Sequence, residues 1–332
     1  MATVLINGFG RIGRTLFRIL LERPGVEVAR INDPLPATQL AYLLQYDTVM
    51  GRLARRVEAR GESLVVGDRP FAVRHAENLG PAEIEGCEIV VNSSGRNNTR
   101  AALEQILALG ARRIVVSMPL APGVGDRTIL RGVNDAELRA EDRIISAGSC
   151  TAHCFTPLLK LIHAHWPVVA GDMLTIHAYT SAQNMVDGGH GADLRRGRAG
   201  AVNIVPTTTE AITAFEQVMP ELAGRIAGMA QRVPVINGSN VELVLQLNAS
   251  VESALINDMV AKAAQNAFKG IVEFSADPLV SSDIVCNPHS AVFDSLLTHS
   301  MPSGSGSLAR VVAWYDNEWG YASRLAELLA ML

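Results

Sequence analysis

The stretch Val4-Leu5-Ile6-Asn7-Gly8-Phe9-Gly10-Arg11-Ile12-Gly13 decides the fold that we expect for the first half of this chain. It begins in the apolar run from Thr3 to Ile6, which is typical of a buried parallel strand. It ends in residues Arg11 to Glu22, whose apolar spacing predicts a helix that Pro24 and Gly25 terminate. The sequence therefore predicts a strand, a glycine-rich turn and a helix.

Gly8, Gly10 and Gly13 form a G-x-G-x-x-G pattern within that turn. In this context one glycine makes the turn, one lets the backbone approach a pyrophosphate, and one lets the helix pack on the strand. N–H groups at the helix start then hold the phosphate charge. We expect a dinucleotide site at this turn, which also includes Phe9, Arg11 and Ile12.

Asn32 and Asp33 end the next predicted strand, Val26 to Ile31, and Asp33 follows the last glycine of the pattern by about 20 residues. A carboxylate at this place accepts hydrogen bonds from the adenosine ribose hydroxyls and repels the 2′-phosphate of NADP. We therefore predict NAD as the cofactor. The alternative is a tight turn followed by a solvated aspartate.

Further strand-like runs alternate with helical patterns up to Gly148, which is the rhythm of a doubly wound parallel sheet. We predict a Rossmann domain at residues 1–148. Beyond it, long alternating runs such as Gly171 to His177 and Asn240 to Leu247 predict an α+β domain with a mainly antiparallel sheet at residues 149–316. The predicted fold class is thus α/β, with a Rossmann domain followed by an α+β domain that we expect to be the catalytic one.

Composition excludes several classes of protein. The chain has 332 residues, 48% hydrophobic and 19% charged, with a net charge of -4, which predicts neither a membrane partner nor a dedicated nucleic-acid surface. The four cysteines lack metal-ligand spacing, so we predict no metal site and expect a reduced, cytoplasmic protein. The N-terminus shows no basic leader and no stretch approaches a membrane span.

Cys150 lies in Ser146-Ala147-Gly148-Ser149-Cys150-Thr151, which reads as strand, small-residue turn and helix start. The positive end of a helix stabilises a thiolate, so we expect a lowered thiol pKa and a nucleophilic sulfur. A buried structural cysteine is the alternative. We expect Cys87 and Cys286 to be core residues.

Several ordered motifs resemble those of phosphorylating glyceraldehyde-3-phosphate dehydrogenases. They are the glycine pattern, Ser149-Cys150-Thr151, Ala201-Val202-Asn203-Ile204-Val205-Pro206-Thr207, Arg232-Val233-Pro234, Asn287-Pro288-His289-Ser290 and Trp314-Tyr315-Asp316-Asn317-Glu318-Trp319-Gly320-Tyr321. The resemblance implies a homotetramer, an NAD site in the first domain, and a C-terminal helix at residues 317–332 that returns to that domain. It also implies that the irregular loop after Gln183 reaches the cofactor of a neighbouring subunit.

This resemblance implies a catalytic pair. An aldehyde must first gain a nucleophile, which Cys150 supplies, and His177 then takes the hydroxyl proton of the hemithioacetal as hydride leaves. We expect the two side chains to titrate as a coupled thiolate–imidazolium pair. For an isolated histidine on a strand, a structural role is the alternative.

The resemblance also implies the binding residues. Thr180 and Arg232 hold the substrate phosphate, and inorganic phosphate binds at Ser149, Thr151, Thr209 and Arg196, with Arg195 as the adjacent alternative to Arg196. Guanidinium groups suit both sites because they stay charged and bind two oxygens at once. The expected NAD-binding residues are Gly8, Phe9, Gly10, Arg11, Ile12, Gly13, Asn32, Asp33, Ser117, Asn317 and Tyr321.

Some positions depart from the family pattern. Ala147 and His153 replace asparagines beside the nucleophile, and Asn92 and Asn97 replace a glutamate and an aromatic residue near the cofactor. Glu210 stands where the family has glycine. Its charge either repels a phosphate dianion, by about 1–4 kcal/mol at close range, or points to solvent at a helix start.

These departures keep two other functions open. The first is the same thioester chemistry on another phosphorylated aldehyde, such as erythrose 4-phosphate, with hydrolytic release of the acid. The second is a nucleotide-binding regulator that has lost catalysis.

Overall fold

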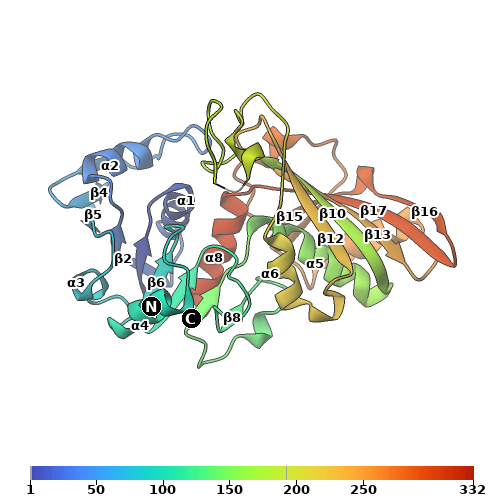
Figure 1. Cartoon of the computed structure of the whole chain (residues 1–332), viewed down its shortest axis with the longest axis horizontal. Coiled ribbons are helices and arrows are strands. Elements are labelled where there is room, and N and C mark those ends of the chain that lie inside the picture. The colour runs from blue at the N-terminus through green and yellow to red at the C-terminus, as the bar shows by residue number, and fades with distance from the viewer. Residues whose placement is uncertain (1, 192) are drawn as a thin grey trace. The chain divides into compact units, whose positions relative to one another are not determined.

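The computed structural model describes residues 2–191 and 193–332, and its backbone divides into two compact units (Figure 1). The first unit contains residues 2–129, 134–148 and 322–332. The second contains residues 130–133 and 149–321. The last helix, α8 (Trp319–Met331), belongs to the first unit from Ala322 onward.

The first unit is built on a sheet in the order β3-β4-β5-β2-β1-β6-β7-β9-β8. Strands β5 to β8 of this order pair in parallel, and β3 to β5 pair antiparallel. Its strands are β1 (Ala2–Asn7), β2 (Val26–Asn32), β3 (Val57–Ala59), β4 (Ser63–Val66), β5 (Arg69–Arg74), β6 (Ile89–Asn92), β7 (Arg113–Val116), β8 (Arg127–Thr128) and β9 (Ile144–Ser146).

The helices of this unit connect its strands, as the doubly wound pattern predicts. They are α1 (Arg11–Leu20), α2 (Ala37–Gln45), α3 (Pro81–Ile84), α4 (Arg100–Ala108) and the short 3₁₀ helix η1 (Asp135–Glu137). Helix α1 is two residues shorter than predicted, because the N–H of Glu22 bonds to Ile19 in a closing turn.

The second unit contains a mainly antiparallel sheet in the order β11-β12-β10-β13-β17-β15-β14, with β16 paired to β17. Its two parallel pairs are β10 with β12 and β14 with β15. The strands are β10 (Val168–Ala178), β11 (Val205–Thr207), β12 (Ile226–Val233), β13 (Ser239–Leu247), β14 (Val272–Ser275), β15 (Ala291–Asp294), β16 (His299–Ser303) and β17 (Gly306–Tyr315). The two sheets confirm the predicted fold class.

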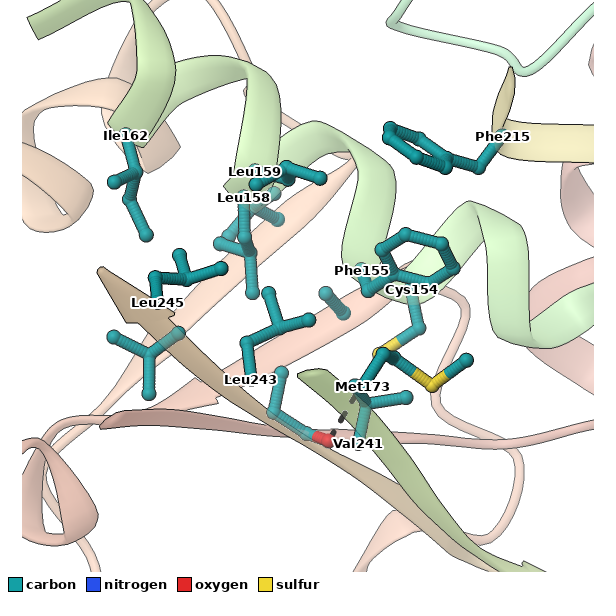
Figure 2. Close-up of a cluster of buried hydrophobic side chains, with 14 of the residues drawn as sticks. Cys154, Phe155, Leu158, Leu159, Ile162, Met173, Phe215, Val241, Leu243 and Leu245 are labelled. Atoms are coloured by element: carbon teal, nitrogen blue, oxygen red, sulfur yellow. Dashed lines mark hydrogen bonds between the residues drawn. The ribbon is translucent and has the colours of Figure 1, made fainter. Parts of the chain in front are cut away.

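Helix α5 (Cys150–His165) covers this second sheet, and Figure 2 shows its apolar side chains packed on the strands. Cys154, Phe155, Leu158 and Ile162 recur at helical spacing and are at most 1% exposed. Removing so many apolar groups from water fixes the helix, and therefore fixes Cys150 at its first position. The other helices are α6 (Ala211–Val218), α7 (Ser253–Gln265), η2 (Leu194–Gly197), η3 (Pro220–Leu222), η4 (Ser281–Ile284) and η5 (Ser295–Leu297).

No helix in the described part of the chain is long and apolar enough to span a membrane.

Candidate active site

The glycine turn between β1 and α1 forms a backbone cradle at a helix start, an arrangement that suits a phosphate group. A Cβ on Gly8 would lie 2.5 Å from the backbone N of Ser94, and one on Gly13 would lie 2.2 Å from the carbonyl oxygen of Gly8. Gly8 also has φ +96°, which favours glycine. Gly10 differs, because its Cβ would meet no atom within 4 Å. Two glycines therefore close the turn, and the third leaves open space at the start of a helix that no side chain caps.

The other residues of the turn are held in place. The backbone N–H of Phe9 donates to Asp33 at 2.8 Å, and its ring is buried. The guanidinium of Arg11 pairs with Asp47, and burial of that carboxyl is outweighed by hydrogen bonds from Met50 and Arg11 that lower its pKa. The backbone of Arg11 is therefore the part that faces the cradle, and its side chain binds the loop that contains Asp47.

Asp33 directly follows the end of β2, where a ribose-binding carboxylate is expected. Its two oxygens accept the N–H groups of Phe9, at 2.8 Å, and Leu35, at 3.0 Å. Each carboxylate oxygen retains a further lone pair for a hydroxyl donor. The residues present thus fit the adenosine half of a dinucleotide.

A chain of buried amides crosses the carboxyl ends of three adjacent strands. Asn32 donates to Asn7 at 2.8 Å, and Asn7 donates to Asn92 at 3.1 Å. The main-chain carbonyl oxygen of Asn92 accepts the N–H of Ser117 at 3.0 Å. Asn92, which replaces the family's glutamate, is therefore a neutral member of a hydrogen-bonded network. Asn97 adopts a left-handed φ of 55°.

Cys150 and His177 lie together in the second unit. Cys150 begins α5 behind the cap residue Ser149, whose hydroxyl accepts the N–H of Ala152 at 3.1 Å. His177 lies near the end of β10, and its Nε2 is 3.5 Å from the sulfur of Cys150. A nucleophile and a base within this distance fit covalent catalysis.

Both pKa shifts in this pair oppose the expected ion pair. Burial raises the pKa of the Cys150 thiol, and the charge of Arg232 offsets this only in part. Burial, together with Arg232, lowers the pKa of His177 to about 3. Our expectation of a lowered thiol pKa was therefore wrong, and the structure favours a neutral thiol beside a neutral imidazole.

Nδ1 of His177 makes two contacts that require different tautomers. Arg232 donates to Nδ1 at 2.7 Å, and this contact requires an unprotonated Nδ1. The carbonyl oxygen of Ala178 also lies 2.7 Å from Nδ1 and can only accept a proton from it. If His177 is to act as a base toward Cys150, its lone pair must lie on Nε2, and the contact of Nδ1 with Ala178 is the one that allows this.

Next to Cys150, the hydroxyl groups of Thr151, Tyr315 and Thr175 form a row of hydrogen bonds whose donors all point in the same direction. Thr175 donates to the carbonyl of Asn240 at 2.9 Å, so its oxygen accepts from Tyr315 at 2.8 Å. Tyr315 must then accept from Thr151 at 2.9 Å. Thr151 lies 4.0 Å from the sulfur but has already given its only proton to Tyr315. Its side chain therefore presents lone pairs, and no donor, to an anion.

Two buried donors without acceptors belong to Arg232, which is expected at the substrate phosphate, and to Gln183, the partner of the other expected residue, Thr180. Arg232 Nε has no partner, and neither has Nε2 of Gln183, whose oxygen accepts the N–H of Thr180 at 2.8 Å. Gln183 is a functional candidate that the sequence did not single out. Buried donors of this kind are costly unless an anion binds them.

The residues expected at the second phosphate are only partly assembled. Arg196 pairs with Asp193 at 2.9 Å and donates to the carbonyl of Thr208 at 3.2 Å, next to Thr209. The Thr209 hydroxyl accepts the N–H of Ala211 at 3.2 Å. Glu210 is exposed and makes no cap hydrogen bond, which corresponds to the solvent-facing alternative.

Asn317 and Tyr321 follow β17 and are both buried. The Asn317 oxygen accepts from the hydroxyl of Ser239 at 3.0 Å. Tyr321 stacks edge-on against His153, with ring centroids 5.8 Å apart. His153 in turn contacts the carbonyl of Ser149 at 3.0 Å, so this replacement still supports the turn before Cys150.

Cys87 and Cys286, which lie away from Cys150, take different positions. Cys87 is buried as expected, but Cys286 is exposed and has φ 64°, so its assignment to the core was wrong. Its backbone N–H donates to Asp316 at 2.7 Å, which fixes this unusual conformation. Within residues 2–191 and 193–332, no three His, Cys, Asp or Glu side chains gather as a metal site.

Comparison with known proteins identifies the relatives of the chain. Residues 2–100 match the family described as glyceraldehyde 3-phosphate dehydrogenase, NAD binding domain, and residues 149–317 match its C-terminal domain. A glyceraldehyde-3-phosphate dehydrogenase of Mycobacterium leprae is 43% identical over 98% of this chain and 97% of its own. One from Geobacillus stearothermophilus is 42% identical over the same shares.

Proposed function

Because the chain belongs to the glyceraldehyde-3-phosphate dehydrogenase family, we propose that it oxidises glyceraldehyde 3-phosphate to 1,3-bisphosphoglycerate with NAD and inorganic phosphate. The observation that carries this proposal is the pairing of Cys150 with His177 at 3.5 Å, beside the half-buried Arg232. An inactive regulator has no need for such a pair.

The proposed reaction begins when Cys150 Sγ attacks the aldehyde carbon and forms a hemithioacetal. His177 Nε2 takes the hydroxyl proton of this adduct. The glycine turn and Asp33 would hold the adenosine half of NAD, Asn317 would meet its nicotinamide, and NAD would supply the hydride acceptor. The product is a thioester on Cys150, and attack by phosphate on it releases the acyl phosphate and restores the thiol.

Arg232 has two tasks in this proposal. Its contact with His177 Nδ1 excludes the tautomer that a base requires, and its Nε has no partner. A phosphate dianion on the substrate draws the guanidinium to itself, because charge-assisted bonds to phosphate are stronger than one to a neutral ring. His177 Nδ1 then donates to Ala178, and Nε2 becomes the base. The substrate's own phosphate thus activates the catalytic histidine.

The site for inorganic phosphate combines Ser149, Arg196 and Thr209 with the backbone N–H of Thr151. The side chain of Thr151 adds no donor while Tyr315 holds its proton. The exposed position of Glu210 supports phosphorolysis, because a solvated carboxylate is screened and repels a dianion weakly.

We further propose a homotetramer in the cytoplasm. Five large apolar side chains of the loop after Gln183 are at least 65% exposed, which is a large apolar surface for a protein without a partner. They are Met185, Val186, Leu194, Val202 and Ile204. Four free cysteines suit a reducing compartment.

The test is NADH formation from glyceraldehyde 3-phosphate with and without phosphate or arsenate. We expect strict dependence on one of these oxyanions, and loss of at least about 1000-fold in rate for Cys150→Ser. Equal rates without either oxyanion would favour hydrolytic release, for which erythrose 4-phosphate is the second substrate to compare. An unaltered rate for Cys150→Ser would overturn the covalent mechanism.

A further inference from the structure

Ser239 is completely buried at the start of β13 and bridges two parts of the second unit. Its hydroxyl oxygen accepts the backbone N–H of Ala178 at 3.0 Å and lies 3.0 Å from Oδ1 of Asn317. A hydroxyl group has one proton, and the N–H of Ala178 can only donate. The proton of Ser239 therefore goes to Asn317, where only the amide oxygen can accept it.

From this network we infer that Ser239 is a positioning residue that fixes the orientation of the Asn317 amide. Oδ1 is held by Ser239, so Nδ2 is the group that Asn317 presents to a ligand. A fixed Nδ2 donor recognises a carbonyl oxygen and does not recognise an amino group. The inference rests on the proposed function, because the ligand it concerns is the carboxamide of the nicotinamide ring.

The backbone around Asn317 is equally constrained. Asp316 is 1% exposed, and its carboxylate accepts the N–H groups of Cys286, at 2.7 Å, Glu318, at 2.8 Å, and Trp319, at 2.7 Å. The side chain of Asn237 donates to it at 3.0 Å. These bonds offset the cost of burying the carboxylate and hold the chain on both sides of Asn317. What the backbone leaves free in Asn317 is its side chain, and the hydrogen bond from Ser239 restrains the orientation of the amide.

The other partner of Ser239 connects this amide to the base. Ala178 directly follows His177 at the end of β10. One hydroxyl group therefore ties the strand that carries the proton acceptor to the residue that would hold the hydride acceptor. Movement of Ala178 or of Asn317 away from Ser239 breaks a buried hydrogen bond, so His177 and Asn317 are held in one rigid frame.

Cofactor analogues distinguish a fixed donor from a rotating amide. The 3-acetylpyridine analogue of NAD keeps the carbonyl oxygen and lacks the amino group, whereas the thionicotinamide analogue has sulfur, a weak acceptor, in place of that oxygen. We expect the wild-type protein to bind NAD and the acetyl analogue with similar affinity and the thio analogue about 3- to 10-fold more weakly, as a lost hydrogen bond predicts.

The experiment measures the dissociation constants of the three cofactors by titration calorimetry, without substrate. Ser239→Ala should weaken NAD binding by about 3- to 10-fold and reduce the difference between NAD and the thio analogue. Ser290→Ala is the matched control, because Ser290 is a buried serine of the same unit whose hydroxyl has no partner. It should leave all three constants unchanged.

The outcomes separate this inference from the proposed function. If the wild-type protein does not bind NAD, the proposed function fails. If it binds NAD and a folded Ser239→Ala variant binds all three cofactors as the wild type does, only the role of Ser239 is overturned. If Ser239→Ala does not fold, Asn317→Asp takes its place. It keeps an oxygen for Ser239 and removes the amide nitrogen, so NAD affinity should fall at least about 10-fold. An unchanged affinity would overturn the inference.

Discussion

The charge of Arg232 acts on His177, and in the proposed function it also binds the substrate phosphate. Replacing Arg232 by leucine removes a cationic neighbour that, after burial, is the second cause of the lowered pKa of His177. The pKa should therefore rise, and the acid limb of the kcat/KM profile should move to higher pH. Unphosphorylated glyceraldehyde is the substrate of choice, because with the phosphorylated aldehyde the variant also loses about 10- to 100-fold in binding.

Arg198→Leu controls for a general change of net charge, because Arg198 is exposed and pairs with Asp187 at 2.9 Å. Its profile should match that of the wild type. An acid limb that stays in place in Arg232→Leu would show that the guanidinium does not govern the protonation of His177.

The direction of the hydroxyl row predicts an unusual effect of Tyr315→Phe. Without the tyrosine oxygen, the Thr151 hydroxyl is free to turn its proton toward the sulfur of Cys150, 4.0 Å away. A hydrogen bond to the thiolate lowers the thiol pKa. The midpoint of iodoacetamide alkylation against pH should therefore move down in the single variant. When Thr151→Val is added, the midpoint should return toward the wild-type value. A midpoint that rises in Tyr315→Phe would contradict the hydrogen-bond direction from Thr151 to Tyr315.

At the scale of elements, the glycine turn offers a test in which three similar substitutions have different results. Gly13→Ala places a methyl group 2.2 Å from the Gly8 carbonyl, so we expect a loss of about 1–3 kcal/mol of stability from overpacking. Gly10→Ala has room and an extended φ of -70°, so the fold should keep its unfolding midpoint. Its methyl group does occupy the open space of the cradle, and NAD affinity should fall.

Thermal unfolding and NAD titration of the two variants measure these effects, with Gly25→Ala as a third variant. Gly25 has φ +98° and open space, so it reports the cost of backbone strain alone. If Gly10→Ala binds NAD as tightly as the wild type does, the pyrophosphate does not approach this glycine.

Local sequence patterns were sufficient to predict β1, the glycine turn and α1, because each is encoded within a few consecutive residues. The same holds for Asp33 at the end of β2 and for the alternation that predicted β10 and β13. The Cys150–His177 pair followed from motifs that the family resemblance supplied.

Contacts between distant residues were not predictable in this way. Tyr315 meets Thr151 across 164 positions, and Ser239 meets Asn317 across 78. Neither hydroxyl stands out in the sequence. The direction of the Cys150 pKa shift was missed for a similar reason. A helix start is visible in the sequence, whereas the burial that outweighs it depends on how α5 packs on the sheet.

At the scale of the whole molecule, the buried imidazole of His177 couples catalysis to stability. Its pKa is about 3 in the folded chain and close to 6.5 when exposed. Between these values the unfolded chain binds a proton that the folded chain does not, so the contribution of His177 lowers stability as pH decreases from about 6.5 toward 3. The contribution of one group is at most about 1.4 kcal/mol per pH unit, and above pH 6.5 it adds no slope.

Urea unfolding of wild type and His177→Gln between pH 7 and 4 measures this coupling, at one protein concentration so that assembly does not change the comparison. The free energy of unfolding of the variant should fall less steeply as pH decreases, because glutamine does not titrate. The difference in slope should be at most that of one bound proton. His165→Gln is the matched control, since His165 is exposed on α5 and its replacement should leave the slope unchanged.

Equal slopes in wild type and His177→Gln would mean that His177 takes up its proton in the folded chain. A histidine so readily protonated would be a poor base at acidic pH, and the catalytic acid limb should then lie near 6.5 as well. The stability and activity profiles thus test one property of one side chain by independent measurements.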